Sequence, residues 1–367
     1  MKRFGFLYEK VVSVDNCRLA ILNASQNKRK RKMVKDVCDN LEDYAKDLSE
    51  RLSRMDFLSP YKTRFIKDGL SGKERELQIP AFYPDQCAHH AIMQVLKPII
   101  ERSSYHWSCA NIPKRGIDHA SKGVERATVR DRKHAKYCVK MDISKFYPSI
   151  PHGKLKARLR EKIKDEKFLQ VIFKVIDSHE QGLPIGNYTS PWLAELYLQP
   201  LDNLIKQKHR IRHHVRYADD LVLIDSNKRK LRKALHDIFE FVGELGLSIK
   251  HDYQLFRIQQ YCKDRSGRRG RKIDFVGRCF GVGFTTIRKR RALALMRQSR
   301  FIQKLQRENR PIAYRIASGF ISRCACFKHT NSYAMRKKYC ETVNIKKLKE
   351  VISNESKRKC LSQLAHH

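Results

Sequence analysis

His214-Val215-Arg216-Tyr217-Ala218-Asp219-Asp220-Leu221-Val222-Leu223-Ile224 is the stretch that decides the fold. Apolar residues, several of them β-branched, lie on both sides of two adjacent acids, which predicts a tight β-hairpin with the acids at its turn. Two ionised acids side by side repel each other, but a divalent cation prefers hard oxygen ligands and reverses that cost. A solvent-exposed acidic turn is the alternative interpretation of an Asp-Asp pair taken alone.

The composition of the 367-residue chain predicts a polyanionic partner. Lys and Arg number 78 against 38 Asp and Glu, a net charge of +40. Nucleic acid is the partner that such an excess favours. An acidic membrane surface is the weaker alternative, because no basic helix shows a clean apolar face. We expect a cytoplasmic protein without a membrane span or secretory signal, and its eleven irregularly spaced cysteines predict free thiols.

A second acid ends another apolar run. Residues 137–142 read as a strand that ends on Asp142, and two aromatic residues, Phe146 and Tyr147, follow it. If this strand lies beside the hairpin, Asp142 and Asp219 could hold two Mg²⁺ ions about 3.5–4 Å apart, the arrangement that promotes in-line phosphoryl displacement. Asp220 could support the hairpin or assist in metal loading.

The rest of the chain alternates between helical and extended patterns. The sequence pattern of residues 1–60 predicts charged helices. The pattern of residues 73–80 predicts a strand, and its cations Lys73 and Arg75 could hold a triphosphate. Ordinary solvated strand charges are the alternative interpretation of those two residues. A hairpin with glycine turns is expected at 273–281, and basic helices from 288 to 360. Tyr314 and Phe320 are expected in the core of those helices.

The order of these motifs resembles the reverse transcriptases. Tyr217-Ala218-Asp219-Asp220 is similar to the Tyr-x-Asp-Asp box of that family, and Asp142 stands where its first catalytic aspartate ends a strand. The resemblance implies an α+β, right-hand polymerase fold with fingers, a palm built on an antiparallel sheet and a helical thumb, preceded by a helical N-terminal extension. The expected domains are an extension at 1–60, fingers and palm at 61–284, and a basic thumb and tail at 285–367.

The resemblance also implies roles for individual residues. The implied catalytic residues are Asp142, Asp219 and Asp220, and the implied ligands of two Mg²⁺ ions, which Mn²⁺ could replace, are these three with Ile143. The implied nucleotide-binding residues are Lys73, Arg75, Tyr147, Ile185 and Gly186, with Tyr147 as the residue that excludes a ribose 2′-hydroxyl. The implied primer grip is Phe275, Val276 and Gly277. The expected nucleic-acid-binding residues are Arg115, Arg268, Arg269, Arg288, Lys289, Arg290 and Arg291.

The function implied is an RNA-directed DNA polymerase that makes cDNA from dNTPs on a structured noncoding RNA, in bacterial antiviral defence. Most reverse transcriptases carry glutamine where this chain has Ile185, and an aliphatic residue there resembles the error-prone enzymes of diversity-generating retroelements. The chain departs from those enzymes at Pro191 and at Leu247-Ser248-Ile249-Lys250, where the lysine sits nearer the leucine than usual. A catalytically silent RNA-binding protein on a polymerase fold is the alternative from another class. A small accessory protein or a second copy of the chain are further expected partners.

Overall fold

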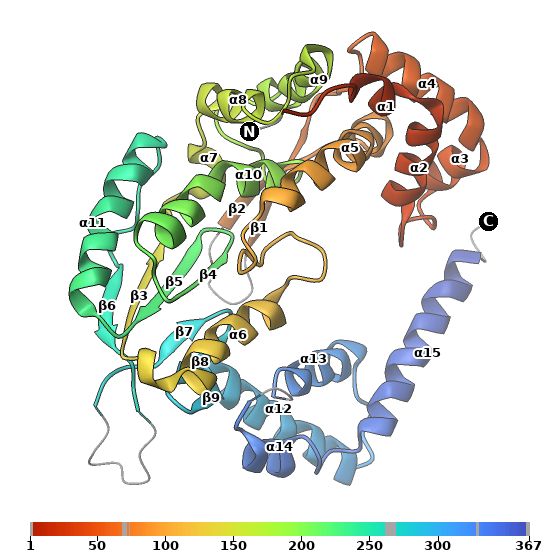
Figure 1. Ribbon diagram of the computed structural model, residues 1–367. Helices are drawn as coiled ribbons and strands as arrows, with labels where there is room; N and C mark the ends of the chain where they lie inside the picture. Colours follow the sequence, from red (N-terminus) through yellow and green to blue (C-terminus); the bar gives the residue numbers. More distant parts are fainter. Residues whose placement is uncertain (1–2, 68–71, 73, 261–268, 328–329, 365–367) are drawn as a thin grey trace. The chain divides into compact units, whose positions relative to one another are not determined.

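The computed structural model describes residues 3–67, 72, 74–260, 269–327 and 330–364. The chain divides into two compact units, and Figure 1 labels the helices and strands that belong to them. Unit 1 comprises residues 1–120 and 139–254, and unit 2 comprises residues 121–138 and 255–367. Each unit is described by itself.

Helices make up most of unit 1. They are α1 (Tyr8–Val12), α2 (Val14–Ser25), α3 (Lys32–Asp39), α4 (Leu41–Ser53), η1 (Phe82–Gln86), α5 (Cys87–Ser103), α7 (Phe146–Ser149), α8 (His152–Arg160), α9 (Glu166–Asp177), α10 (Ser190–Asn203), η4 (Leu204–Lys208) and α11 (Lys228–Glu244). Side-chain caps fix several starts: Asp165 accepts a hydrogen bond from Phe168 N at α9, and Asn227 accepts one from Lys230 N at α11. Asp165 also accepts from the backbone of Leu7 and Tyr8, which ties the N-terminal segment to α9.

Two sheets belong to the part of the fold that holds the predicted site. Strands β1 (Lys62–Lys67) and β2 (Glu74–Ile79) pair as an antiparallel ribbon, largely exposed. A four-stranded sheet has the order β4-β5-β3-β6. Its strands are β3 (Tyr137–Asp142), β4 (His213–Tyr217), β5 (Asp220–Asp225) and β6 (Gln254–Arg257). Because β5 is a run of apolar and β-branched residues, it is buried from Leu221 to Asp225, and α11 packs against it.

Unit 2 contains a three-stranded antiparallel sheet, β7 (Ile273–Phe275), β8 (Arg278–Gly281) and β9 (Phe284–Ile287). Its helical elements are η2 (Arg126–Arg130), η3 (Arg132–His134), α12 (Lys289–Arg307), α13 (Tyr314–Ala325), α14 (Tyr333–Tyr339) and α15 (Ile345–Leu364), and α6 (Ile117–Glu125) crosses from unit 1. Leu295, Ile302, Phe320 and Leu348 are at the centre of the helical core.

The local predictions agree with most of these elements. The hairpins at 214–224 and 273–281, the strands ending at Asp142 and Ile79, and the helical character of 1–60 and 288–360 are confirmed. The expectation that Tyr314 lies in a core is wrong: its exposed fraction is 39%, because it is the first residue of α13, whereas Phe320 is fully buried. The cysteines within the described residues are free, as expected.

Candidate active site

The hairpin that carries the two adjacent acids has a two-residue turn. Tyr217 pairs with Asp220, so Ala218 and Asp219 form the turn and Asp220 opens β5. Ala218 has a φ of 54°, a left-handed conformation that costs a non-glycine residue energy. Arg216 Nη1 donates a hydrogen bond to the Ala218 carbonyl oxygen at 3.2 Å, which supports this conformation.

Asp142, at the end of β3, lies beside this turn. The backbone N–H of Ile143 donates to the Asp219 carbonyl oxygen at 3.4 Å. Ile143 also forms an antiparallel bridge with Ile249, and Lys250 N donates to the Asp142 carbonyl oxygen at 2.9 Å. The structure therefore brings Asp142, Ile143, Asp219 and Asp220 together from two strands that are far apart in the sequence.

These carboxylates, with Lys250, form what we call the aspartate cluster (Asp142, Asp219, Asp220 and Lys250). Burial and then the negative charge of Asp142 raise the pKa of Asp219 to about 7. Lys250 Nζ forms an ion pair with Asp142 Oδ2, whereas Asp142 Oδ1 is buried without a hydrogen-bond partner in the described part of the chain. An unpartnered carboxylate oxygen next to a second carboxylate fits a divalent cation, since hard oxygen ligands are those that Mg²⁺ prefers.

A second charged cluster lies on the same hairpin, one residue pair from its turn. Arg216 is the largest fully buried side chain, and its guanidinium pairs with Asp202 at 2.6 Å and with Glu195 at 3.0 Å. Both acids come from α10, where a spacing of seven residues puts them on one helix face. Ser108 Oγ donates to Glu195 Oε2 at 2.8 Å. Asp202, Glu195 and Arg216 thus join α10 to the strand that leads into the Asp-Asp turn.

His214 completes this buried Arg216 cluster (Glu195, Asp202, His214, Arg216 and Ser108). Its ring is fully buried, lies 3.4 Å from Asp202 and stacks on Tyr105 at 5.0 Å between ring centroids. Burial, followed by the charges of Arg216 and Lys206, lowers the pKa of His214 well below its ordinary value. The imidazole is therefore neutral at physiological pH.

The predicted nucleotide-binding loop packs on two neighbouring elements. Gln78 N, from β2, donates to the Ile185 carbonyl oxygen at 2.9 Å. Gly186 has a φ of 139°, and a Cβ added there would lie 2.0 Å from the Gln78 carbonyl oxygen, so only glycine allows this approach. Leu183 N donates to the Tyr147 carbonyl oxygen at 2.8 Å. The structure thus brings Tyr147, Ile185 and Gly186 together with the strand that carries the exposed Arg75.

Tyr147 lies near the aspartate cluster. Burial raises the pKa of its hydroxyl, the negative charge of Asp219 raises it further, and the amide of Asn111 opposes both. Next to the loop is a cavity of about 430 Å³ whose lining includes Lys28, Gly186 and Tyr188. The rings of Tyr188 and His90 stack there, 4.0 Å apart.

The predicted primer grip and basic residues lie on well-defined elements of unit 2. Phe275 is buried at the end of β7, and Val276 and Gly277 turn with φ of 43° and 83°. A Cβ on Gly277 would lie 2.5 Å from the Arg291 guanidinium, so Arg291 packs directly over this turn. Arg288 pairs with Asp274 at 2.5 Å.

Among the other residues predicted to bind nucleic acid, some side chains are exposed and one makes a hydrogen bond within the protein. Lys289 and Arg290 are exposed at the start of α12, and Arg269 is exposed. In unit 1, Arg115 donates to the Tyr105 carbonyl oxygen at 2.7 Å. Lys73 and Arg268 lie outside the described residues.

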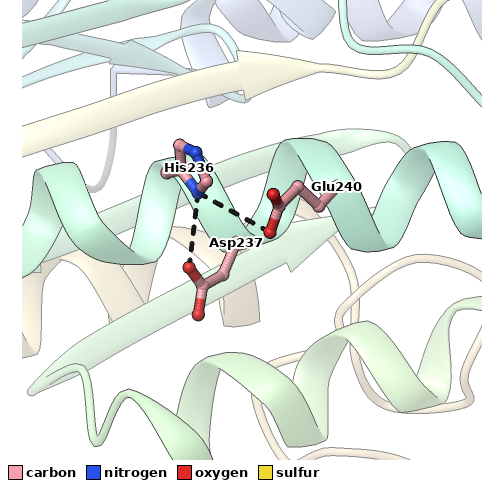
Figure 2. Close-up of side chains that lie close together, drawn as sticks. All are labelled: His236, Asp237 and Glu240. Atoms are coloured by element: carbon pink, nitrogen blue, oxygen red, sulfur yellow. Dashed lines mark ion pairs between the residues drawn. The ribbon is translucent and has the colours of Figure 1, made fainter.

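One other group of potential ligands lies on the surface of α11, where His236 is within 3.6 Å of both Asp237 and Glu240 (Figure 2). Asp237 is already paired with Lys208 at 2.7 Å. His236 and Glu240 are exposed, and acidic groups of this kind are common without an ion. This group is therefore not assigned as a second metal site, and its two acids provide control substitutions for the aspartate cluster.

Sequence reasoning did not assign roles to four residues that the structure places around the site: Lys250, Arg216, Glu195 and Asp202. Two signals could have identified some of them. Arg216 is a charged residue next to Val215 in a strand that pairs with an apolar one, and Glu195 and Asp202 are acids on one face of a helix whose other residues are mostly buried.

Comparison with known proteins defines the class. The profile of the family described as reverse transcriptase (RNA-dependent DNA polymerase) matches residues 71–258, about half of the chain, including all three aspartates. The chain therefore belongs to the reverse transcriptase family. Its two-stranded ribbon, antiparallel sheet and helices agree with the α+β polymerase fold that the sequence predicted.

The curated relatives are distant. The retron Ec73 reverse transcriptase of Escherichia coli is 31% identical over 137 residues, 34% of this chain and 43% of that protein. The group II intron-encoded protein LtrA of Lactococcus lactis subsp. cremoris is 28% identical over 218 residues, 56% of this chain and 36% of that protein. Protein YkfC of Escherichia coli K12 is 25% identical over 150 residues, 38% of this chain and 39% of that protein. The aligned parts thus span less than half the length of each of these relatives.

Among solved structures, telomerase from Candida albicans in complex with a TWJ fragment of telomeric RNA aligns with a TM-score of 0.48 and 11% identity, over 81% of this chain and 60% of that one. Apo telomerase from Candida tropicalis, truncated from the C-terminal domain, aligns with a TM-score of 0.47 and 15% identity, over 67% of this chain and 60% of that one.

Within the described residues, no helix combines the length and the apolar character that crossing a membrane requires.

Proposed function

We propose that this chain is an RNA-directed DNA polymerase that copies a structured noncoding RNA into cDNA by adding deoxynucleotides to a primer 3′-hydroxyl. The observation that carries the proposal is the pairing of Asp142 with Asp219, in a member of the reverse transcriptase family, with one buried carboxylate oxygen left without a partner. An acidic turn that served only the fold would gain nothing from a second carboxylate brought to it by another strand.

The aspartates supply the metal site in this proposal. Asp142, Asp219, Asp220 and the carbonyl of Ile143 would hold two Mg²⁺ ions, for which Mn²⁺ could substitute. When bound, such ions lower the pKa of an attacking hydroxyl and neutralise a leaving pyrophosphate. The protein contributes the rigid placement of the ligands, since the ladder of β3 and the Arg216–Ala218 hydrogen bond fix their backbone.

The neighbouring loop and strand bind the nucleotide. Tyr147 lies under the sugar and excludes a 2′-hydroxyl, while Lys73 and Arg75 hold the triphosphate as fixed cations. The contact of Gly186 with Gln78 keeps β2 against the loop that carries Ile185. Tyr188, stacked on His90, offers an aromatic face to an unpaired base of the template.

Nucleic acid is held by the hairpin Phe275-Val276-Gly277 as primer grip and by basic side chains. These are Arg115, Arg268, Arg269, Arg288, Lys289, Arg290 and Arg291. A protein that neutralises 6–10 phosphates loses roughly 10³–10⁵ in affinity between 50 and 200 mM salt, so binding should be strongly salt-dependent.

The biological role we propose is synthesis of cDNA from a cognate RNA in the bacterial cytoplasm during antiviral defence, with a small accessory protein or a second copy of the chain as a further partner. The similarity to a retron reverse transcriptase supports a bacterial retroelement setting. The second candidate is the error-prone polymerase of a diversity-generating retroelement, which Ile185 favours. A template repeat and a variable repeat beside the gene would decide for the second candidate.

Primer extension tests the proposal. Wild-type protein and the variant Asp219→Ala plus Asp220→Ala are incubated with an RNA template, a DNA primer, labelled dNTPs and Mg²⁺. We expect template-dependent extension by the wild type and a loss of at least about 10³-fold in the variant, the order of effect that removal of a group stabilising transition-state charge produces. The matched control is Asp237→Ala plus Glu240→Ala, which removes the same charge from the surface of α11 and should extend normally. Normal extension by Asp219→Ala plus Asp220→Ala would refute the assignment of the polymerase site, and no extension by the wild type would favour a silent RNA-binding protein.

A further inference from the structure

Lys250 is fixed beside the end of β3 by backbone contacts. Lys250 N donates to the Asp142 carbonyl oxygen at 2.9 Å, and Ser144 N donates to the Ser248 carbonyl oxygen at 2.7 Å. Ile249 and Ile143 form an antiparallel bridge between these two hydrogen bonds. The backbone of Lys250 therefore keeps its place relative to Asp142.

The side chain of Lys250 already occupies part of the proposed metal site. Its ammonium forms an ion pair with Asp142 Oδ2, and both side chains are about one third exposed, at 35% and 30%. Asp142 Oδ1, by contrast, is buried and has no hydrogen-bond partner among the described residues. One oxygen of this ligand is thus held by an internal cation and the other is open.

An internal cation in this position opposes an external one. Two positive charges a few ångströms apart repel each other, although solvent screens part of the repulsion at a site that is about one third exposed. A lysine ammonium is a compact charge on a flexible four-carbon stem, so Nζ can leave Asp142 while the backbone stays in place. A divalent ion that binds Asp142 must either displace the ammonium or bind beside it, and both routes cost affinity.

We propose that Lys250 is a built-in counter-cation that neutralises Asp142 in the metal-free protein and lowers the affinity of the aspartate cluster for divalent cations. Metal loading then depends on the negative charge of an incoming triphosphate, which offsets the lysine. This inference rests on the proposed metal site. In that site Lys250 positions Asp142 in the metal-free protein and competes with the divalent cation for it.

A titration with Mn²⁺ alone, without nucleotide or nucleic acid, tests the inference. The electron paramagnetic resonance signal of free Mn²⁺ reports binding to full-length wild type, Lys250→Gln and Lys250→Arg. We expect Lys250→Gln to bind Mn²⁺ roughly tenfold more tightly, because one repelling charge is gone, and Lys250→Arg to bind like the wild type. The matched control is Lys156→Gln, which removes a lysine paired with Asp177 at 2.6 Å and should leave the affinity unchanged.

Unfolding temperatures provide a second readout. In EDTA, Lys250→Gln should unfold at a lower temperature than the wild type, because Asp142 has lost its counter-charge, and saturating Mn²⁺ should raise its unfolding temperature more than that of the wild type. If Lys250→Gln does not fold in EDTA, Lys250→Met is titrated instead, since it keeps the chain length without the charge.

Unchanged or weaker Mn²⁺ binding by the uncharged variants would overturn the role of Lys250. That outcome leaves the polymerase proposal standing if the wild type still extends primers. If the wild type does not extend primers but Lys250→Gln binds Mn²⁺ more tightly than the wild type, the polymerase proposal fails and the proposed role of Lys250 stands.

Discussion

The same hairpin carries two charged clusters that differ in how their charges are satisfied. In the buried Arg216 cluster, one guanidinium pairs with Asp202 and Glu195, and all three side chains are almost fully buried. In the aspartate cluster, at the turn of the same hairpin, the ammonium of Lys250 pairs with Asp142, and all three carboxylates remain partly exposed. In the first cluster the guanidinium of Arg216 and the carboxylates of Glu195 and Asp202 are paired with one another, and only the neutral ring of His214 has nitrogens without a hydrogen bond among the described residues. In the second cluster it is a carboxylate oxygen, Asp142 Oδ1, that has no such partner.

The difference separates a structural charge from a functional one. A buried charge is tolerated when the fold supplies its partner, as Arg216 does for both acids of α10. In the aspartate cluster, Asp142 Oδ1 stays unpartnered, and burial and the charge of Asp142 raise the pKa of the neighbouring Asp219. Two carboxylates in this state indicate that a cation from outside the chain is needed. The first cluster should therefore govern stability, and the second should govern metal binding and chemistry.

The largest expected effect on stability comes from breaking the buried Arg216 cluster. Arg216→Met leaves two buried carboxylates without a cation and should lower the free energy of unfolding by about 3–5 kcal/mol. Denaturant unfolding in EDTA measures it. The compensated variant Arg216→Met with Asp202→Asn and Glu195→Gln should recover most of this loss, since no unpaired charge remains buried.

The matched change in the other cluster is Asp219→Asn. It removes a carboxylate whose ionised form is disfavoured by burial and by the charge of Asp142. The free energy of unfolding should therefore stay the same or rise, while primer extension is lost. A destabilisation by Asp219→Asn as large as that by Arg216→Met would remove the distinction between the clusters.

A smaller effect concerns pH. Because the pKa of His214 is lowered in the folded state, the folded protein binds fewer protons than the unfolded chain below pH 6.5. The contribution of the neutral His214 to the free energy of unfolding is therefore fully present above pH 6.5. It is lost as the pH falls below that value, by up to about 1.4 kcal/mol per pH unit. His214→Phe, which keeps an aromatic ring against Tyr105, should show a shallower loss between pH 6.5 and 5.

The control for this pH effect is the exposed His236 on α11. His236→Phe should leave the slope of stability against pH as in the wild type. If His214→Phe also keeps the wild-type slope, the buried imidazole is not the group responsible for the acid loss.

Local sequence patterns predicted the elements that carry the site. The hairpin around Asp219 and the strand ending at Asp142 could be recognised because alternation of apolar runs, acids and glycine turns depends only on neighbouring residues. The approach of the two aspartates was inferred from the chemistry that they could perform together, and the structure places them side by side.

The contacts that were missed are long-range. Lys250 is 108 residues from Asp142 in the sequence, and nothing local indicates which acid it meets. Arg216 belongs to the hairpin, whereas its partners Glu195 and Asp202 are on a helix that precedes it, so burial of the trio depends on packing. The aromatic character of Tyr314 predicts a core position, but its place at the start of α13 leaves it exposed.

Binding of Mn²⁺ to the wild type and to the variant Asp142→Asn plus Asp219→Asn tests the central claim most directly, because it asks whether the aspartate cluster is the metal site. Equilibrium titrations are carried out with template, primer and a non-hydrolysable dNTP analogue present. We expect the wild type to bind two Mn²⁺ ions that the variant does not bind, while both proteins keep the same affinity for template and primer at fixed salt. Binding of the same number of ions by both proteins would contradict the account.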